Sequence, residues 1–405
     1  MRRLLSILLL AVPLAVWAQT TPLTESEAVR RGLARAELSD LDFSSVEMAK
    51  SDAVAAGLPP NPTVSYTRDH GPGPNAYNEE TWLLSQSFDL SGRRRLRREA
   101  AEQRVAAAYS GNRLRRNEWA AEIRRRFYET LFKQEAVRAT GAWVQRFKRV
   151  AGIIEKLTKA GEASGYDRRR LARERQNAEL RLAAAQSDLD RLSLQLAALL
   201  DRLGDPADAL VGELLPGLPS PTDQVLLDIE RRPDLQVLSR NAAAADLEGR
   251  AAARGWIPDV TLGVGPKRRD DGLLHETNTV LFVSIPLPVF DHQQAGQQRA
   301  AAEALSARSE FNLARGRAEG ERRGLYRQLE RLIGAAHEYR VKAIADSPEL
   351  LRVAEAAYKG GESSLLELLD AYRGALDTQI NALELDWKAR QARIEYDLLT
   401  GSVAQ

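Results

Sequence analysis

The sequence predicts a mainly helical fold with a small β part, built from one unit that occurs twice. The segments Lys159-Ala160-Gly161-Glu162-Ala163-Ser164 and Lys359-Gly360-Gly361-Glu362-Ser363-Ser364 are nearly alike, and each interrupts a stretch rich in Ala, Leu, Arg and Glu. No proline occurs between Pro74 and Pro206. Because an interior proline costs a helix about 3 kcal/mol, such intervals can hold very long helices. Each similar segment is therefore predicted to be the turn between two long helices.

The amino-terminal residues have the layout of a secretory signal peptide. Two arginines precede an apolar run from Leu4 to Trp17, and the small residue Ala18 follows it. We expect residues 1–18 to be removed by cleavage after Ala18. No later segment has eighteen consecutive apolar residues, so no transmembrane helix is expected in the mature chain. The periplasm or the outer membrane of a two-membrane bacterium is the expected destination.

Composition excludes several classes of function. The chain has no cysteine, which excludes disulfides, thiolate metal sites and a lipidated amino-terminal cysteine. The formal net charge is only +2 although 28% of the residues are charged, so no basic face predicts nucleic-acid binding. The four histidines are scattered without ligand spacing, and no catalytic set of residues is recognisable. We therefore expect no enzyme activity, no cofactor and no metal site.

The helices of the first unit are predicted over residues 92–159 and 166–203. A continuous helix over residues 92–159 would be roughly 100 Å long at 1.5 Å per residue. The returning helix carries an a/d heptad pattern that predicts coiled-coil packing and that ends before Gly204-Asp205-Pro206. The pattern consists of Ala178, Leu182, Ala185, Leu189, Leu192, Leu196, Leu199 and Leu203.

A β-hairpin precedes the long helices in each unit. In the first unit, residues 63–88 enclose a loop rich in glycine and proline. In the second unit, residues 259–287 contain alternating apolar residues and a run of β-branched ones, and long helices are predicted over residues 292–358 and 364–400. The predicted repeats are residues 19–221 and 222–405.

Four strands are too few to form a membrane-spanning barrel. An outer-membrane barrel needs at least about eight strands, and open strand edges are not tolerated in lipid. If the hairpins enter a membrane, several chains must therefore pool their strands. Strand number alone allows two, three or four chains.

The residues from Tyr358 to Ala371, around the second turn, resemble a family signature. They are similar to the tyrosine, glycine and acidic-hydrophobic-hydrophobic-acidic-alanine pattern of the TolC-like outer-membrane efflux proteins, also called outer-membrane factors. The resemblance covers the whole mature chain, including its duplication. It implies a homotrimer with a twelve-stranded β-barrel in outer-membrane lipid and an α-helical barrel across the periplasm. It also implies a passive exit duct that receives substrate from an inner-membrane efflux pump through a periplasmic adaptor.

The resemblance assigns two kinds of site. Six turn residues match the helix-hairpin tips where adaptors dock, and small residues there let another helix approach closely. Three residues match the periplasmic gate, and two of these are carboxylates that would form stacked acidic rings in a trimer. The tip residues are Gly161, Glu162, Ser164, Gly361, Glu362 and Ser364, and the gate residues are Tyr358, Glu367 and Asp370.

The two units are not equal at the gate. Asp167 of the first unit is followed by Arg170 where the second unit has Asp370, so the gate is expected mainly in the second unit. Ser363 stands where some family members carry a basic residue of a gate-locking bridge, so any lock here must use other partners. Solvated helix surface is the alternative interpretation of Glu367 and Asp370.

Several alternatives remain open at this stage. The signature around the second turn is most similar to the cobalt-zinc-cadmium efflux branch, but the exit of a type I protein-secretion system has the same family fold. From another class, a soluble periplasmic coiled-coil adaptor could carry two hairpins. The sequence does not identify the substrate, the pump, the adaptor, or the open or closed state.

Overall fold

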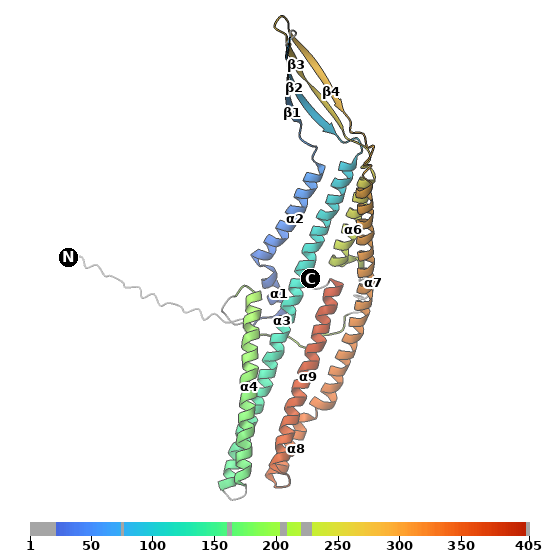
Figure 1. The fold of residues 1–405 in the computed structure, drawn as a ribbon. Coiled ribbons are helices and arrows are strands. Elements are labelled where there is room, and N and C mark those ends of the chain that lie inside the picture. Colours follow the sequence, from blue (N-terminus) through green and yellow to red (C-terminus); the bar gives the residue numbers. More distant parts are fainter. Residues whose placement is uncertain (1–21, 74–76, 160–163, 203–208, 220–228, 402–405) are drawn as a thin grey trace, which may run out of the picture.

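The computed structural model of the chain describes residues 22–73, 77–159, 164–202, 209–219 and 229–401. The expected signal peptide, Gly161 and Glu162 lie outside these residues. The chain is elongated, with a small sheet at one end and paired helices running to the other (Figure 1). This confirms the prediction of a mainly helical fold with a small β part.

The first unit runs from the amino-terminal helices to the first helical hairpin. A short helix begins after Thr24, whose hydroxyl accepts the Glu27 N–H and so caps it. The elements are α1 (Glu25–Leu33), α2 (Ala36–Gly57), β1 (Thr63–Gly71), β2 (Tyr77–Phe88), α3 (Arg93–Lys159) and α4 (Gly165–Leu199).

Helix α4 ends at Leu199, a few residues before the predicted end near residue 203. Asp201 has a left-handed backbone with φ of 59°, and the Arg202 N–H donates to the Ala197 carbonyl at 2.9 Å. A residue in this conformation followed by such a bond terminates a helix, and aspartate tolerates it better than most residues. The described residues of the predicted heptad seam are buried or half-buried.

The second unit repeats this order after a linker. Helix α6 begins with Pro233 in its first turn, where the missing N–H removes no helical bond. The elements are η1 (Ile229–Arg231), α6 (Pro233–Ala253), β3 (Val260–Asp270), β4 (His275–Ser284), α7 (Gln294–Tyr339), the π-helical segment η2 (Arg340–Ile344), α8 (Ser347–Lys359) and α9 (Leu365–Thr400).

The predicted single helix over residues 292–358 is divided in the structure. Helix α7 ends at Tyr339, the π-helical turn follows, and α8 starts at Ser347 with Pro348 in its first turn. Proline cannot donate an interior helical bond but is accepted in the first turn of a helix, so the chain restarts a helix at this point. The sequence showed Pro348 but not the π-helical turn before it.

The strands form one antiparallel sheet in the order β1-β2-β3-β4, so the two hairpins meet where β2 pairs with β3. At this seam the backbones are very close, because a Cβ atom on Gly265 would lie 1.8 Å from the Trp82 carbonyl oxygen. Glycine is therefore required at residue 265 for the pairing of the two units.

One face of the sheet carries exposed apolar side chains. The register places Val64 opposite Leu84, Leu84 opposite Val264, and Val264 opposite Leu281, which makes an apolar row across all four strands. On the same face, the rings of Tyr66 and Trp82 lie 4.7 Å apart. Successive side chains of a strand alternate between faces, so the other face presents the intervening residues.

The helices near the sheet are arranged in the same order as the strands. Contacts join α2 to α3, α3 to α6, and α6 to α7. These four helices directly precede or follow β1, β2, β3 and β4 in the chain, and a loop joins each strand to its helix (Figure 1). Farther from the sheet the order becomes α4, α3, α9 and α8. Next to the sheet the single chain is therefore a layer with two free edges, whereas near the tips α3, α4, α8 and α9 share one hydrophobic cluster.

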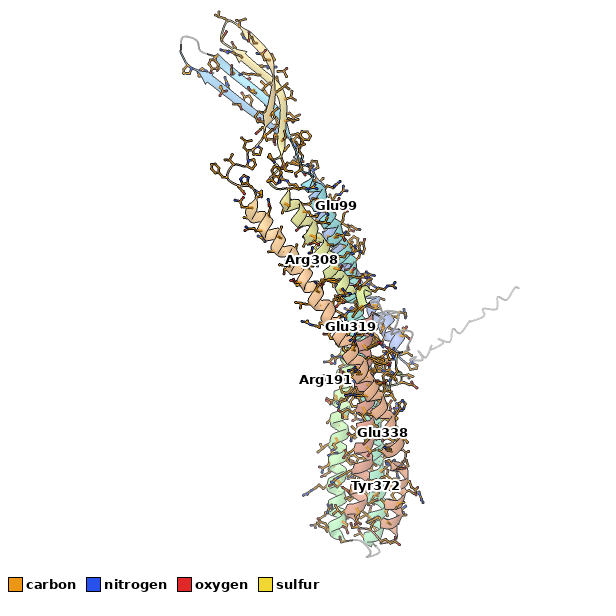
Figure 2. All side chains as sticks on the ribbon, turned by 90° about the vertical axis from the view of Figure 1, so that its right-hand side faces the viewer. Glu99, Arg191, Arg308, Glu319, Glu338 and Tyr372 are labelled. Carbon is orange, nitrogen blue, oxygen red and sulfur yellow. The ribbon has the colours of Figure 1, made fainter. Side chains whose placement is uncertain are left out.

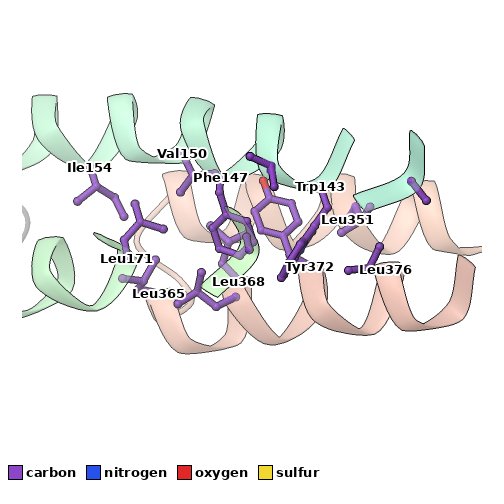
Figure 3. Packing of buried hydrophobic residues seen from close by; sticks show 14 residues of the cluster. Trp143, Phe147, Val150, Ile154, Leu171, Leu351, Leu365, Leu368, Tyr372 and Leu376 are labelled. Carbon is purple, nitrogen blue, oxygen red and sulfur yellow. The ribbon is translucent and has the colours of Figure 1, made fainter. Parts of the chain in front are cut away.

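Three hydrophobic clusters of the described residues hold the helices together, and two of them are much larger than the third. One surrounds Phe127 and Leu196 near the middle of the molecule, and the other lies near the helix-hairpin tips (Figure 3). In the second cluster Phe147 of α3 packs edge-on against Trp143 and Tyr372, with ring centroids 4.8 and 5.9 Å away. Burying a side chain such as Phe147 stabilises the fold by about 1.5–3 kcal/mol.

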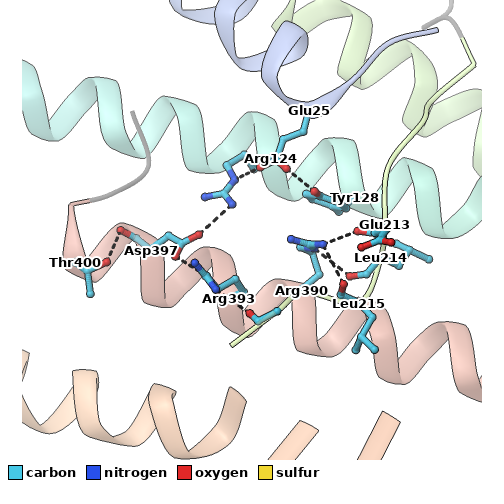
Figure 4. Close-up of polar contacts among 11 residues, drawn as sticks. Glu25, Arg124, Tyr128, Glu213, Leu214, Leu215, Arg390, Arg393, Asp397 and Thr400 are labelled. Carbon is cyan, nitrogen blue, oxygen red and sulfur yellow. Dashed lines mark hydrogen bonds and ion pairs between the residues drawn. The ribbon is translucent and has the colours of Figure 1, made fainter. Parts of the chain in front are cut away.

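A polar network joins the two units at mid-length (Figure 4). Arg124 of α3 forms ion pairs with Glu25 and, at 3.0 Å, with Asp397 of α9. Arg390 stacks 4.4 Å from the Tyr128 ring centroid and donates to the Leu214 carbonyl at 3.0 Å. The amino-terminal helix, the linker between the units and the last helix are thus fixed to one another.

The outer surfaces of the helices are highly charged along their length (Figure 2). Many of the charges pair within one helix, as in Glu338 with Lys342 at 2.6 Å, or between helices, as in Arg308 with Asp246 at 2.7 Å. Exposed pairs of this kind contribute about 0–1 kcal/mol each and mainly keep the surface solvated. In the part of the chain that is described, no helix has the length and apolarity needed to cross a membrane.

Candidate functional site at the helix-hairpin tips

The second tip begins with a tight helix end. Gly361 has φ of 72°, the Glu362 N–H donates to the Ala357 carbonyl at 2.9 Å, and the Gly361 N–H donates to the Tyr358 carbonyl at 3.2 Å. These two bonds are those of a Schellman motif, which requires a left-handed residue at its centre. A Cβ atom on Gly361 would contact nothing within 4 Å. The glycine therefore serves the turn and leaves open space beside it.

Helix α9 then starts with a capping box. The Ser364 hydroxyl accepts the Glu367 N–H at 3.3 Å, and the Glu367 carboxylate accepts the Ser364 N–H at 2.8 Å. Both bonds satisfy backbone donors that would otherwise lack partners at a helix start. Glu367, which the family resemblance assigns to the gate, thus has a local structural role within the single chain.

The first tip uses the same device. The Ser164 hydroxyl accepts the Asp167 N–H at 3.1 Å, and Asp167 in turn accepts from the Ser164 N–H and hydroxyl. The spacing Ser-x-x-Asp at 164–167 matches Ser-x-x-Glu at 364–367, and this spacing is the sequence signal for a capping box. The helices that follow the two turns, α4 and α9, therefore begin with the same hydrogen-bonding pattern.

Tyr358 lies between the two tips. Its side chain is half-buried in the last turn of α8 and lines a cavity of about 130 Å³ together with Arg149 of α3 and Tyr372 of α9. Burial raises the pKa of the Tyr358 hydroxyl, and the negative charge of Asp167 raises it further. The structure thus brings Asp167 of the first unit into the electrostatic range of Tyr358 of the second.

Asp370 and Glu367 are both exposed, one turn apart on α9. Exposure fits either a pore lining or a solvated helix, so their placement in acidic rings stays a prediction. Glu362, which belongs to the predicted docking tip, is also exposed. The Ser363 hydroxyl has no hydrogen-bond partner among the described residues, so it supplies no lock within the chain.

An ion pair that the sequence did not reveal joins the two hairpins behind the tips. Arg373 of α9 contacts Glu174 of α4, and the Glu174 side chain is only 12% exposed. Nearby, the Tyr372 hydroxyl donates to Glu355 of α8 at 2.6 Å, which joins the helices of the second hairpin. Neither pair has a distinctive sequence spacing, because partners on different helices are set by tertiary packing.

Comparison with known proteins agrees with this architecture. Residues 227–402 match the family model described as outer membrane efflux protein. The chain is 26% identical over 79% of its length to the cobalt-zinc-cadmium resistance protein CzcC of Cupriavidus metallidurans, covering 77% of that protein. It is 25% identical over 76% of its length to the nickel and cobalt resistance protein CnrC of the same organism, covering 75% of it.

A solved structure has the same fold. The structure of CusC superimposes with a TM-score of 0.78 at 17% sequence identity, covering 93% of this chain and 91% of that one. The elongated duplicated chain with this sheet and these tips therefore has the fold of the CusC transmembrane channel. The second unit of the chain matches the outer membrane efflux protein family, and the location of the chain is the cell outer membrane.

Proposed function

We propose that three copies of this chain form the passive outer-membrane exit duct of a tripartite efflux system. The single observation that carries the proposal is the layer with two free edges and one apolar sheet face. Strands β1 and β4 each pair on one side only within the described sheet. An exposed apolar row beside unpaired strand edges is stable in lipid only when the edges meet and close a barrel.

The helical edges support the same closure. Exposed apolar side chains lie on α2 at one edge, among them Phe43 and Met48, and on α7 at the other, among them Leu305 and Leu313. Joining the α7 and β4 edge of one chain to the α2 and β1 edge of the next is a head-to-tail contact, which closes a ring. Three chains supply twelve strands, the number that the family resemblance implies.

The tips supply the proposed periplasmic functions. The docking residues are Gly161, Glu162, Ser164, Gly361, Glu362 and Ser364, where a periplasmic adaptor would bring substrate from an inner-membrane pump. The open space beside Gly361 supports close approach of a partner helix. Tyr358, Glu367 and Asp370 form the proposed gate, and threefold symmetry would turn each carboxylate into a ring of three charges that favours cations.

We propose heavy-metal cations as the substrate class. Support comes from CzcC and CnrC, whose names describe resistance to cobalt, zinc and cadmium and to nickel and cobalt. Passage through a duct needs no bound metal. Among the described residues, no group of three or more His, Cys, Asp and Glu side chains is arranged to hold a metal ion.

The proposal is tested on the mature chain purified from outer membranes. Light scattering in detergent should give the mass of three chains, and the protein should form ion-conducting channels in planar bilayers. Deleting the gene should also raise cobalt or zinc sensitivity, with restoration by the intact gene. A monomer without channel activity, or recovery in the soluble periplasmic fraction, would contradict the proposal.

A further inference from the structure

A compact charged cluster lies on the sheet near its hairpin loops. Glu79 of β2 contacts Lys267 of β3 at 2.7 Å and Arg269 of β3 at 3.7 Å. The Arg269 guanidinium also lies 5.0 Å from the centroid of the Tyr77 ring. The Glu79 side chain is only 15% exposed, whereas those of Lys267 and Arg269 are 36% and 50% exposed. The positively charged side chains of Lys267 and Arg269 therefore both pair with the largely buried carboxylate of Glu79.

The cluster lies on the face opposite the apolar row. Glu79 and Leu84 are an odd number of residues apart in β2, as are Lys267 and Val264 in β3, and strand side chains alternate between faces. If the apolar row faces lipid, as the proposed function requires, Glu79, Lys267 and Arg269 face the interior of the duct. The inference drawn below rests on that proposed function.

Further carboxylates stand beside the cluster. The register places Asp69 opposite Glu79 and Glu276 opposite Arg269. Neighbouring carboxylates with exposed oxygens are the ligands that bind divalent cations in proteins. Lys267 and Arg269 oppose the binding of divalent cations, because both form ion pairs with Glu79 and their positive charges offset those of the neighbouring carboxylates.

We propose that Lys267 and Arg269 determine the ion specificity of the outward end of the duct, by occupying Glu79 so that the exit does not retain divalent cations. A duct that releases metal cations benefits from an exit where those cations do not bind. Charged side chains inside a barrel tune its selectivity, and six added cations in a trimer disfavour cation entry from outside.

The test uses the full mature protein in planar bilayers at low salt, where charge effects are least screened. Replacing both cations, as in Lys267→Gln with Arg269→Gln, should raise the potassium-to-chloride permeability ratio about threefold. Millimolar cobalt or zinc chloride should then reduce the conductance of the variant while leaving the wild type unchanged. Adding Glu79→Gln to the two substitutions should abolish the cobalt block.

Arg268→Gln is the matched control, because Arg268 lies between the two residues in sequence but on the opposite face. It should leave both permeability and cobalt sensitivity unchanged. An unaltered permeability ratio in the double variant, or an equal change in Arg268→Gln, would overturn the inference while channel formation still supports the proposed function. If the double variant fails to assemble, Glu79→Gln alone should lower the ratio, and no change there would overturn the inference too.

Discussion

Arg373 of α9 forms an ion pair with Glu174 of α4 and thereby joins the second helical hairpin to the first. Glu174 is almost fully buried, whereas Arg373 is partly exposed. The pair lies behind the tips at which both hairpins turn. It therefore fixes the separation of the hairpins from within one chain.

We expect Arg373→Gln to destabilise the folded chain by about 1 kcal/mol, because it leaves the Glu174 carboxylate buried without its cation. Adding Glu174→Gln should recover most of that loss, since two neutral amides can bond to each other. Thermal unfolding of both variants checks the prediction. Equal stability of Arg373→Gln and the wild type would show that solvent screens the pair.

Glu367 offers a way to separate capping from gating. Glu367→Ala removes the carboxylate that bonds the Ser364 N–H and should cost about 0.5–1 kcal/mol of stability. Glu367→Gln keeps that bond and removes only the charge. If the acidic rings exist, Glu367→Gln with Asp370→Asn should change single-channel conductance and cation preference without loss of stability.

Conductance of purified trimers in bilayers, read beside thermal unfolding, measures both effects. Asp167→Asn in the first unit is a control that removes a capping charge of the other hairpin. A conductance unchanged by the Glu367 and Asp370 pair would refute their assignment to the gate.

Substitutions of Gly361 can distinguish the effect of its backbone conformation from the effect of side-chain size. Any other residue at φ of 72° costs about 1–2 kcal/mol, so Gly361→Ala and Gly361→Leu should be destabilised to a similar extent. A Cβ atom there meets nothing within 4 Å in the chain, so the larger leucine should add little further cost. Only Gly361→Leu should then abolish efflux, by obstructing the adaptor.

Trimer formation and metal resistance in cells are the two measurements for this pair. Loss of trimer in both variants would make Gly361 a purely structural residue. Full efflux by Gly361→Leu would place adaptor docking elsewhere.

Asp386 of α9 should make stability depend on pH. Its side chain is buried and pairs with Arg340 of the π-helical segment, while one carboxylate oxygen has no hydrogen-bond partner among the described residues. Burial raises the pKa of Asp386 more than Arg340 lowers it. Because the folded pKa exceeds the unfolded one, the folded state binds more protons between the two, so stability from this group rises as pH falls through that interval.

We therefore expect Asp386→Asn to be at least as stable as the wild type at neutral pH, by up to about 1 kcal/mol. The variant should also gain less stability on mild acidification. The measurement is the difference between the two unfolding free energies as a function of pH. A lower stability of Asp386→Asn at every pH would show that the Arg340 ion pair outweighs the burial of Asp386.

The architecture could be predicted because its signals are local. Each signal predicts the structure of the segment in which it occurs: the long intervals without proline, the heptad seam of residues 178–203 and the alternation around Val264. The similarity of the two turns then joined these segments into one repeated plan. The break between α7 and α8 was less evident, because the π-helical turn before Pro348 depends on how α7 packs against α9.

The candidate site could be predicted only in part. The capping boxes at Ser164 and Ser364 are written in the sequence, whereas the ion pair of Arg373 with Glu174 depends on which helix faces come together. Likewise, the ion pairing of Glu79 with Lys267 depends on the register of β2 against β3, which the residue spacing within one strand does not predict.

The unpaired outer edges of β1 and β4 in the described sheet affect the stability of the protein before it assembles. Helices form their backbone hydrogen bonds internally, so the helical part can fold in a single chain. The outer strands of the sheet, in contrast, need a strand of another chain to complete their hydrogen bonds. If the chain forms the proposed trimer, a newly exported copy must therefore meet two others before proteases cleave it or other strands pair with it. Because assembly of several chains depends on their concentration, a reduction in the rate of synthesis should lower the amount of assembled protein by a larger factor.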